Sequence, residues 1–256
     1  MRAEWEPVAA GESGARVLRS ADGSRYAKCV PAEATPALEA ERDRVGWLGA
    51  QGIPAPRVLD WHADAAGARL VTSAVEGVPA DRLTAPELWA AWEPIADAVR
   101  RLHELPVRRC PFGRGLAGMF ALARDVVARG AVNPDFLPEE QRHTPPDALL
   151  ARLAPQLERR LAQEAAEAVV CHGDLCLPNI VLDPETREVA GFIDLGRLGR
   201  ADPYADIALL LANARETWPD ADRARAADEA FARRRGTALD SERQRFYLHL
   251  DPLTWG

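Results

Sequence analysis

The strongest constraint on the fold is a change in residue pattern near residue 76. Before it, short β-like runs separated by Gly, Asp and Pro occur at residues 16–19, 25–30, 57–59 and 69–72. Between the second and third runs, residues 36–51 have apolar residues at helical spacing, and Gly52 ends the pattern. After the change, long segments of helical period occur at about 84–105, 116–130, 146–167, 203–217 and 221–249. The sequence therefore predicts an α+β protein with a small sheet and one helix, followed by a mostly helical part.

One strand-rich segment interrupts the helical part. Apolar runs at residues 168–171, 180–182 and 189–193 enclose the polar residues 172–179. Apolar strands hold the polar side chains between them at fixed positions, which is what a catalytic loop requires. The pattern therefore predicts that the catalytic residues lie in this segment.

Composition narrows the classes of function. Hydrophobic residues at 47% and charged residues at 28% are typical of a globular protein, and the longest apolar run is far too short to cross a bilayer. A net charge of −7 argues against a nucleic-acid partner, whose phosphates demand basic patches. Residues 1–6 are acidic and contain no apolar segment of a secretory signal. We expect a cytoplasmic protein with no membrane and no nucleic-acid partner.

The four cysteines suggest free thiols, because their spacing shows no disulfide framework and a chain of this length does not need one. Cys171 and Cys176 flank His172 and Asp174, which raises the question of zinc. Their spacing matches no common zinc pattern, so zinc is the weaker interpretation.

Lys28 is the only lysine among the 32 lysine and arginine residues of the chain. A general preference for arginine explains the missing lysines but not the one that remains. Lysine presents a compact point charge, whereas arginine presents a broad planar fork. Lys28 therefore indicates a site that needs an ammonium group, with chance survival as the alternative.

Three polar residues in and after the strand-rich segment have the spacing of a phosphotransfer site. Asp174 precedes Asn179 by five positions, and Asp194 follows fifteen positions later, just before Leu195 and Gly196. Phosphoryl transfer needs a carboxylate for the accepting hydroxyl and two oxygen ligands for the magnesium that bridges the phosphates. The order and spacing match the protein-kinase pattern. They predict Asp174 as the base and Asn179 and Asp194 as Mg²⁺ ligands, although each alone could be a turn former or helix cap.

The first part of the chain supplies candidates for phosphate binding. Lys28 would contact the α- and β-phosphates of ATP, and Glu41, thirteen residues on in the one predicted helix, would hold it in place. The glycine-containing residues 11–14 could cover the phosphates with backbone N–H groups. No Gly-x-x-x-x-Gly-Lys-Ser/Thr motif occurs, which excludes a Walker-type P-loop.

These motifs, together with residues 192–199 and the later Asp202 and Asp206, resemble the aminoglycoside phosphotransferase family. Residues 11–14, 133–138, 170–174 and 250–256 are similar, more narrowly, to the branch of that family that phosphorylates streptomycin. The resemblance implies a protein-kinase-like two-lobed fold, with residues 1–75 as the nucleotide-binding lobe and residues 76–256 as the catalytic and substrate-binding lobe. It also implies transfer of the γ-phosphate of ATP to the 3″-hydroxyl of streptomycin, which inactivates the antibiotic.

The resemblance further implies roles for individual residues. Ser13 would lie in the phosphate loop, the backbone of Ala74 and Val75 would meet adenine, and His172 and Asp206 would brace the catalytic loop. His103 lies between apolar neighbours on a predicted helix, and its own context predicts a packed structural histidine.

Acidic residues are candidates for contact with the acceptor. Streptomycin carries guanidinium groups, so charge-assisted hydrogen bonds would suit the carboxylates of Asp135, Glu216 and Asp251. Plain surface solvation explains the same three residues equally well.

Two alternatives remain at this point. The same chemistry could act on another aminoglycoside, choline or a sugar. A non-catalytic nucleotide-binding pseudokinase is the alternative from a different class. The intact set of Lys28, Asp174, Asn179 and Asp194 argues against it, since a binding module needs no base.

Overall fold

The computed structural model describes residues 4–8 and 15–256, and these form two compact units. The first unit contains the described residues up to Arg82 together with residues 178–197, and the second contains residues 83–177 and 198–256. The first unit is therefore discontinuous in sequence, because the chain returns to it after the first half of the second.

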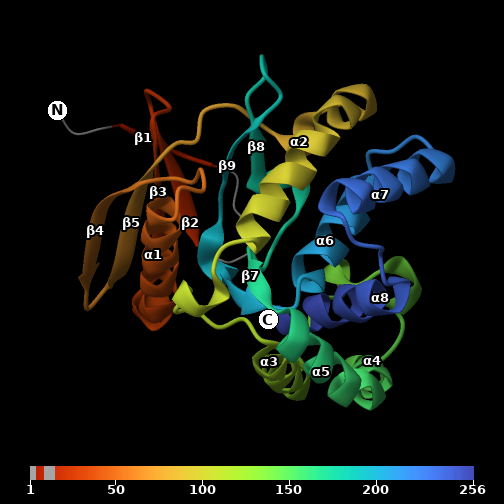
Figure 1. Ribbon diagram of the computed structural model, residues 1–256. Coiled ribbons are helices and arrows are strands. Elements are labelled where there is room, and N and C mark those ends of the chain that lie inside the picture. The colour runs from red at the N-terminus through yellow and green to blue at the C-terminus, as the bar shows by residue number, and fades with distance from the viewer. Residues whose placement is uncertain (1–3, 9–14) are drawn as a thin grey trace. The chain divides into compact units, whose positions relative to one another are not determined.

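A five-stranded antiparallel sheet forms most of the first unit, in the order β1-β2-β3-β5-β4. Its strands are β1 (Trp5–Pro7), β2 (Arg16–Ser20), β3 (Arg25–Pro31), β4 (Val58–Asp64) and β5 (Gly67–Ser73). The chain passes from β3 to β4 through a 3-10 turn, η1 (Ala32–Ala34), and helix α1 (Thr35–Ala50), which lies against the sheet (Figure 1). Leu38 of α1 packs on Ala68 and Leu70 of β5, so burial of one apolar face joins helix to sheet.

A second, three-stranded antiparallel sheet completes the first unit, in the order β6-β8-β9. It consists of β6 (Val78–Pro79), β8 (Ile180–Leu182) and β9 (Val189–Phe192), with the 3-10 turns η2 (Ala80–Arg82), η7 (Leu177–Asn179) and η8 (Leu195–Arg197) nearby in sequence. The Phe192 amide donates to the carbonyl of Pro54 at 3.0 Å, which ties the β8–β9 hairpin to the segment after α1.

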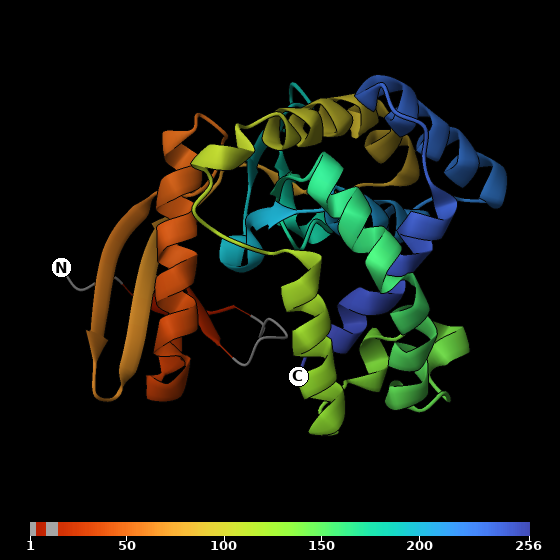
Figure 2. The ribbon, with the colours of Figure 1, turned by 60° about the horizontal axis from the view of Figure 1, so that its bottom comes forward.

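Seven helices and one short two-stranded sheet make up the described second unit (Figures 1 and 2). The helices are α2 (Ala85–His103), α3 (Leu116–Ala128), α4 (Pro146–Leu153), α5 (Leu157–Glu167), α6 (Tyr204–Arg215), α7 (Ala221–Arg235) and α8 (Ser241–Leu250). The strands are β7 (Val169–Cys171) and β10 (Gly199–Ala201), paired antiparallel. The 3-10 turns are η3 (Val107–Arg109), η4 (Pro134–Phe136), η5 (Glu139–Gln141), η6 (Ala154–Gln156) and η9 (Asp251–Thr254).

Packing in the second unit joins α2 to α7 and α6 to α8. Trp92 of α2 is buried, donates its indole N–H to the carbonyl of Ala227 at 2.8 Å, and packs edge-on against Trp218 with ring centroids 5.4 Å apart. Trp218 is therefore also a core residue. No helix among the described residues combines the length and apolarity that crossing a membrane requires.

Two predicted helical segments are each divided in the structure. The segment 221–249 becomes α7 and α8, because Gly236 ends α7 with a φ of 76° and Asp240 caps α8 by accepting from the Arg243 amide at 2.9 Å. The segment 146–167 is divided at η6, which contains Pro155, a residue without an amide hydrogen.

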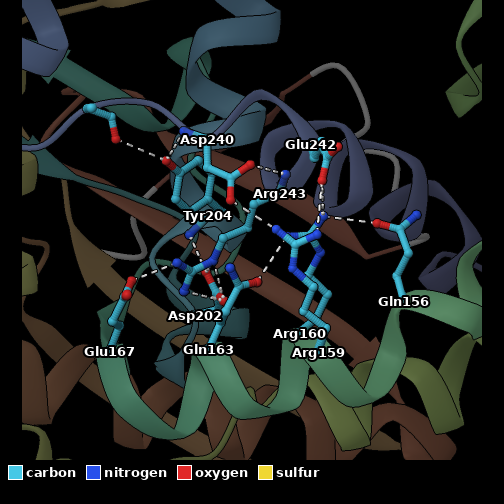
Figure 3. A network of polar contacts seen from close by, with 11 residues as sticks. Gln156, Arg159, Arg160, Gln163, Glu167, Asp202, Tyr204, Asp240, Glu242 and Arg243 are labelled. Atoms are coloured by element: carbon cyan, nitrogen blue, oxygen red, sulfur yellow. Dashed lines mark hydrogen bonds and ion pairs between the residues drawn. The ribbon is translucent and has the colours of Figure 1, made fainter.

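Buried charges fix the start of α6. The Arg243 guanidinium of α8 donates through Nε to both carboxylate oxygens of Asp202, at 3.0 and 2.8 Å, and through Nη1 to Glu167 of α5 at 2.6 Å (Figure 3). Asp202 also accepts from the Tyr204 amide at 2.9 Å, at the first residue of α6. Arg243 and Asp202 are both buried. The free energy lost when these two charges leave water offsets most of their attraction, so the network fixes the geometry of this region more than it stabilises the fold.

Candidate active site

Lys28 lies on the central strand of the five-stranded sheet and points a charged group at two carboxylates. Its Cα pairs with Val17 of β2 and Leu70 of β5, so the strand is held on both sides. The ammonium Nζ lies 2.8 Å from Glu41 Oε2 and 3.2 Å from Asp194 Oδ1. The structure thus joins three residues that the sequence separates by as many as 166 positions.

The electrostatics of this cluster keep the lysine charged. Burial lowers the pKa of Lys28, but the charges of Glu41 and Asp194 outweigh it, and the net pKa is raised. Burial, with help from the nearby Asp194 charge, raises the pKa of Glu41 against the opposing pull of Lys28. The Lys28 ammonium therefore offsets the free-energy cost of an ionised carboxylate at position 41.

Asn179 and Asp194 are placed by the β8–β9 hairpin. The hairpin pairs Ile180 with Phe192, and the Ile193 amide donates to the carbonyl of Asn179 at 3.0 Å. Asp194 adopts a φ of 56°, in the left-handed region that side chains other than glycine rarely occupy. Such strain costs on the order of 1–2 kcal/mol and concentrates at functional sites. An amide oxygen and a carboxylate at one end of a hairpin are the hard oxygen ligands that suit Mg²⁺.

A pocket of about 490 Å³ lies within the first unit and contains all four of these polar residues. Its lining is otherwise largely apolar, with Val17, Tyr26, Leu70, Val75, Val181 and Ile193 among the residues that form it. An apolar pocket with a few convergent charged groups is the usual form of a small-molecule site. Val75 lines the pocket, whereas Ala74 is tied to the sheet by its amide, which donates to the carbonyl of Ser24 at 2.8 Å.

The predicted phosphate loop cannot be placed in this pocket. Ser13 and the other residues of 11–14 lie outside the described part of the chain.

In the second unit, Asp206 anchors the loop that carries Asp174. Its carboxylate accepts the amide of His172 on Oδ2 and the amide of Gly173 on Oδ1, each at 2.8 Å. Gly173 has a φ of 83°, a conformation that glycine adopts without steric cost. Asp174 follows immediately and is half-buried. The loop geometry before Asp174 is thus set by a fully buried carboxylate on the first turn of α6.

A second residue of α6, not predicted from the sequence, holds the other end of the loop. Asn213 Oδ1 accepts the amide of Leu177 at 2.8 Å. Asp206 and Asn213 are seven residues apart, so they lie on one face of the helix, with the loop fixed on both sides of Asp174. The sequence signal for this contact was an asparagine seven residues after Asp206, beyond the apolar run of residues 207–212.

His103 is buried and packed, but it also has a polar partner that the sequence did not predict. Its Nε2 lies 2.9 Å from Asp206 Oδ2, and its Nδ1 lies 3.3 Å from Arg235 Nη2. His103, Cys171 and Asp206 form the one buried group of potential metal ligands found among the described residues. Burial raises the pKa of the Cys171 thiol well above its ordinary value, and the Asp206 carboxylate already accepts three N–H groups, so this group suits an anchor better than a metal site.

The three acidic residues predicted to contact the acceptor have different surroundings. Asp135 and Glu216 are exposed. Asp251 is buried, forms an ion pair with Arg114 at 3.5 Å and accepts the indole N–H of Trp255 at 3.0 Å. Phe136, next to Asp135, packs edge-on against Trp255 at 6.0 Å between ring centroids, so Asp135 lies near the C-terminal segment that carries Asp251.

The fold and this arrangement of lysine, asparagine and carboxylates are those of a kinase-like phosphotransferase. A family model for the phosphotransferase enzyme family matches residues 4–244, and the chain belongs to that family. This confirms the resemblance and the fold class predicted from the sequence.

The most informative similarities are to proteins from Streptomyces. The chain is 69% identical over 253 residues to the streptomycin 3″-kinase of Streptomyces griseus, covering 99% of this chain and 93% of that protein. It is 43% identical over 260 residues to an aminoglycoside 3′-phosphotransferase of Streptomyces fradiae, covering 97% and 94%. Among solved structures, the aminoglycoside phosphotransferase APH(3″)-Id from Streptomyces rimosus, in complex with ADP and streptomycin, is 72% identical with a TM-score of 0.95, covering 99% of this chain and 94% of that one.

Proposed function

We propose that this protein transfers the γ-phosphate of ATP to the 3″-hydroxyl of streptomycin. The observation that supports the acceptor most directly is the 69% identity to a streptomycin 3″-kinase over almost the whole chain. The pocket around Lys28, Glu41, Asn179 and Asp194 supports the nucleotide. Because ATP is the expected donor, we place the activity in the cytoplasm.

The residues of the pocket would bind the triphosphate. Lys28, held by Glu41 and charged at neutral pH, would contact the α- and β-phosphate oxygens. Val75, with the neighbouring backbone of Ala74, would meet adenine, and Ser13 would contribute to the phosphate loop. Asn179 and Asp194 would hold Mg²⁺, which when bound neutralises negative charge on the phosphate oxygens.

Asp174 would orient the accepting hydroxyl and take its proton. A bond forms between the 3″-oxygen and the γ-phosphorus, while the bond from that phosphorus to the bridging oxygen of ADP breaks. His172 and Asp206 would act indirectly, by fixing the loop that presents Asp174.

Streptomycin would be bound through its guanidinium groups. Asp135 and Glu216 are exposed carboxylates able to accept charge-assisted hydrogen bonds. Asp251 would contribute less than the other two, because Arg114 and Trp255 already occupy its oxygens.

The test is mass analysis of streptomycin after incubation with the protein, ATP and magnesium. Wild-type protein should add one phosphate group, at the 3″-hydroxyl. The Asp174→Asn variant should lose transfer by about 100-fold or more while keeping its fold and its affinity for ATP, since general-base catalysis contributes about 10²–10⁴-fold. Asp183→Asn is the matched control and should be fully active, because it changes a half-buried carboxylate in the β8–β9 turn and keeps an oxygen able to accept the amides of Glu185 and Thr186.

Other outcomes would select another function. Phosphorylation of a different aminoglycoside, choline or a sugar, with none of streptomycin, would retain the chemistry and change the acceptor. An increase in thermal stability with ATP, without phosphate transfer to any acceptor, would support a nucleotide-binding pseudokinase instead.

A further inference from the structure

Three polar side chains of the second unit, the buried His103 and Asp206 and the half-buried Arg235, form a continuous chain that ends on the loop carrying Asp174. Arg235 of α7 approaches His103 of α2 at 3.3 Å, and His103 contacts Asp206 of α6 at 2.9 Å. Asp206 in turn accepts the amides of His172 and Gly173. The proposed base therefore depends on contacts that begin 61 positions later in the sequence, on a different helix, at Arg235.

The partners of His103 fix its tautomer. A guanidinium can only donate hydrogen bonds, so the Nδ1 atom that faces Arg235 Nη2 must accept. Nε2 then carries the hydrogen and donates it to Asp206, whose ionised carboxylate can only accept. One neutral tautomer satisfies both contacts, and neither the other tautomer nor the imidazolium does.

We propose that His103 is a positioning residue for phosphoryl transfer: fixed in one tautomer by Arg235, it holds the Asp206 carboxylate in the orientation that keeps the two amides before Asp174 in place. This inference rests on the proposed function, because it assigns a task to a residue through Asp174. It also accounts for a histidine at a site where simple packing needs only an apolar side chain.

The charges around Asp206 support this role. Burial raises the pKa of Asp206, but the hydrogen bonds from His103 and from the Gly173 amide help to outweigh it, so the net pKa is lowered. The titratable and charged groups that face Asp206 are His103 from α2, Arg114 from the loop before α3, Cys171 from β7, His172 from the loop itself and Arg235 from α7. Of these, His103 donates its Nε2 hydrogen to the carboxylate, at 2.9 Å between Nε2 and Oδ2.

Two substitutions at position 103 separate positioning from packing. His103→Leu keeps a side chain of similar bulk but removes both polar contacts. His103→Gln can still donate to Asp206 and accept from Arg235, because a primary amide has a donor and an acceptor. We expect kcat to fall about 10- to 100-fold in His103→Leu, as for lost supports of a reacting group. The KM values for ATP and streptomycin should change less than about twofold, and His103→Gln should recover most of kcat.

The pH profile adds a signature that a packing defect would not produce. Without the His103 donor, the pKa of Asp206 rises, so its charge is lost at higher pH as the solution is acidified. The acid limb of kcat should therefore move to higher pH in His103→Leu and stay in place in His103→Gln.

Arg235 and its neighbour provide a matched pair of variants on α7. Arg235→Met removes the donor that fixes the His103 tautomer, and kcat should fall in the same direction as in His103→Leu. Arg234→Met removes an exposed ion pair between the same two helices, in which Arg234 Nε donates to Asp97 at 2.8 Å. This control should leave kcat unchanged, because an exposed pair contributes little to positioning.

Hydrogen exchange at the His172 and Gly173 amides tests the proposal independently of activity. Both amides should exchange faster in His103→Leu than in wild type, relative to the amides of β7, and His103→Gln should restore protection. Unchanged exchange and unchanged kcat in His103→Leu would overturn the proposal, and so would a rise in KM with kcat retained. If His103→Leu fails to fold, Arg235→Met decides by the same two measurements. If wild-type protein leaves streptomycin unmodified, the proposed function fails, while the exchange result still decides whether His103 positions the loop.

Discussion

At the scale of single residues, the contacts of Lys28 explain why this position has a lysine in a chain rich in arginine. Its compact ammonium contacts Glu41 and Asp194 at once, at 2.8 and 3.2 Å, on the central strand of the sheet. A planar guanidinium is longer and directs its donors in a fixed fork, so it would not meet both oxygens from the same position. The lysine also balances the buried carboxylate of Glu41, which gives it a structural task besides phosphate binding.

Removal of Lys28 should therefore make stability depend on pH. In Lys28→Met, burial raises the pKa of Glu41 without an opposing cation, so the folded state binds a proton that the unfolded state releases. The free energy of unfolding should then fall as pH rises above the unfolded glutamate pKa of about 4.3. We expect a loss of about 1–3 kcal/mol at neutral pH relative to wild type, measured by urea unfolding at several pH values.

The double variant Lys28→Met with Glu41→Gln is the control for this assignment. A neutral amide at position 41 has no charge to bury, so the slope of stability against pH should disappear. A slope that persists in the double variant would mean that another group titrates.

At the scale of elements, helix α6 sets the position of the loop that carries Asp174. Asp206 and Asn213 on one face of the helix accept amides from the two ends of that loop. The buried network of Arg243 and Asp202 fixes the start of the same helix (Figure 3). A shift of α6 along its axis would move all of these acceptors together.

Substitutions of Asn213 test whether α6 positions this loop. In Asn213→Leu, the amide of the buried Leu177 loses its acceptor, which should cost about 1–3 kcal/mol of unfolding free energy and lower kcat more than KM. Asn213→Asp keeps an oxygen at the same position and should retain most of both, with kcat and urea midpoints as the measurements. Equal losses in the two variants would show that the Asn213 oxygen is not what holds the loop.

The sequence predicted the elements better than it predicted the contacts between them. Local patterns can be recognised from the sequence alone, and they include the spacing of Asp174, Asn179 and Asp194 and the position of Lys28. The boundary between α7 and α8 was missed, because the helical period continues on both sides of it. Gly236 and Asp240 are nevertheless ordinary helix-end residues that could have indicated it. The contacts of Asn213 with Leu177 and of Arg235 with His103 join residues 36 and 132 positions apart, and no local pattern records such pairs.

At the scale of the whole molecule, the pocket for the nucleotide belongs to a unit that is discontinuous in sequence. Residues 178–197 contribute Asn179, Val181, Ile193 and Asp194 to a pocket that is otherwise lined from residues before 82. A nucleotide-binding lobe of residues 1–75 alone stays a prediction, and it would lack these four side chains. The return segment supplies both proposed magnesium ligands, so the binding of ATP should depend on it.

Hydrogen exchange with and without ADP and magnesium should reveal this dependence. Ligand at about 100 times its Kd stabilises the protein that binds it by about 2.7 kcal/mol, which slows amides that exchange through opening of the whole unit by about 100-fold. We expect slower exchange in β3 and β5 and, to the same degree, in β8 and β9, because burial against one ligand couples both segments. Streptomycin without nucleotide is the control ligand and should leave these strands unchanged. Protection confined to residues before 76 would instead mean that the first 75 residues bind the nucleotide by themselves, and that the return segment takes no part in the site.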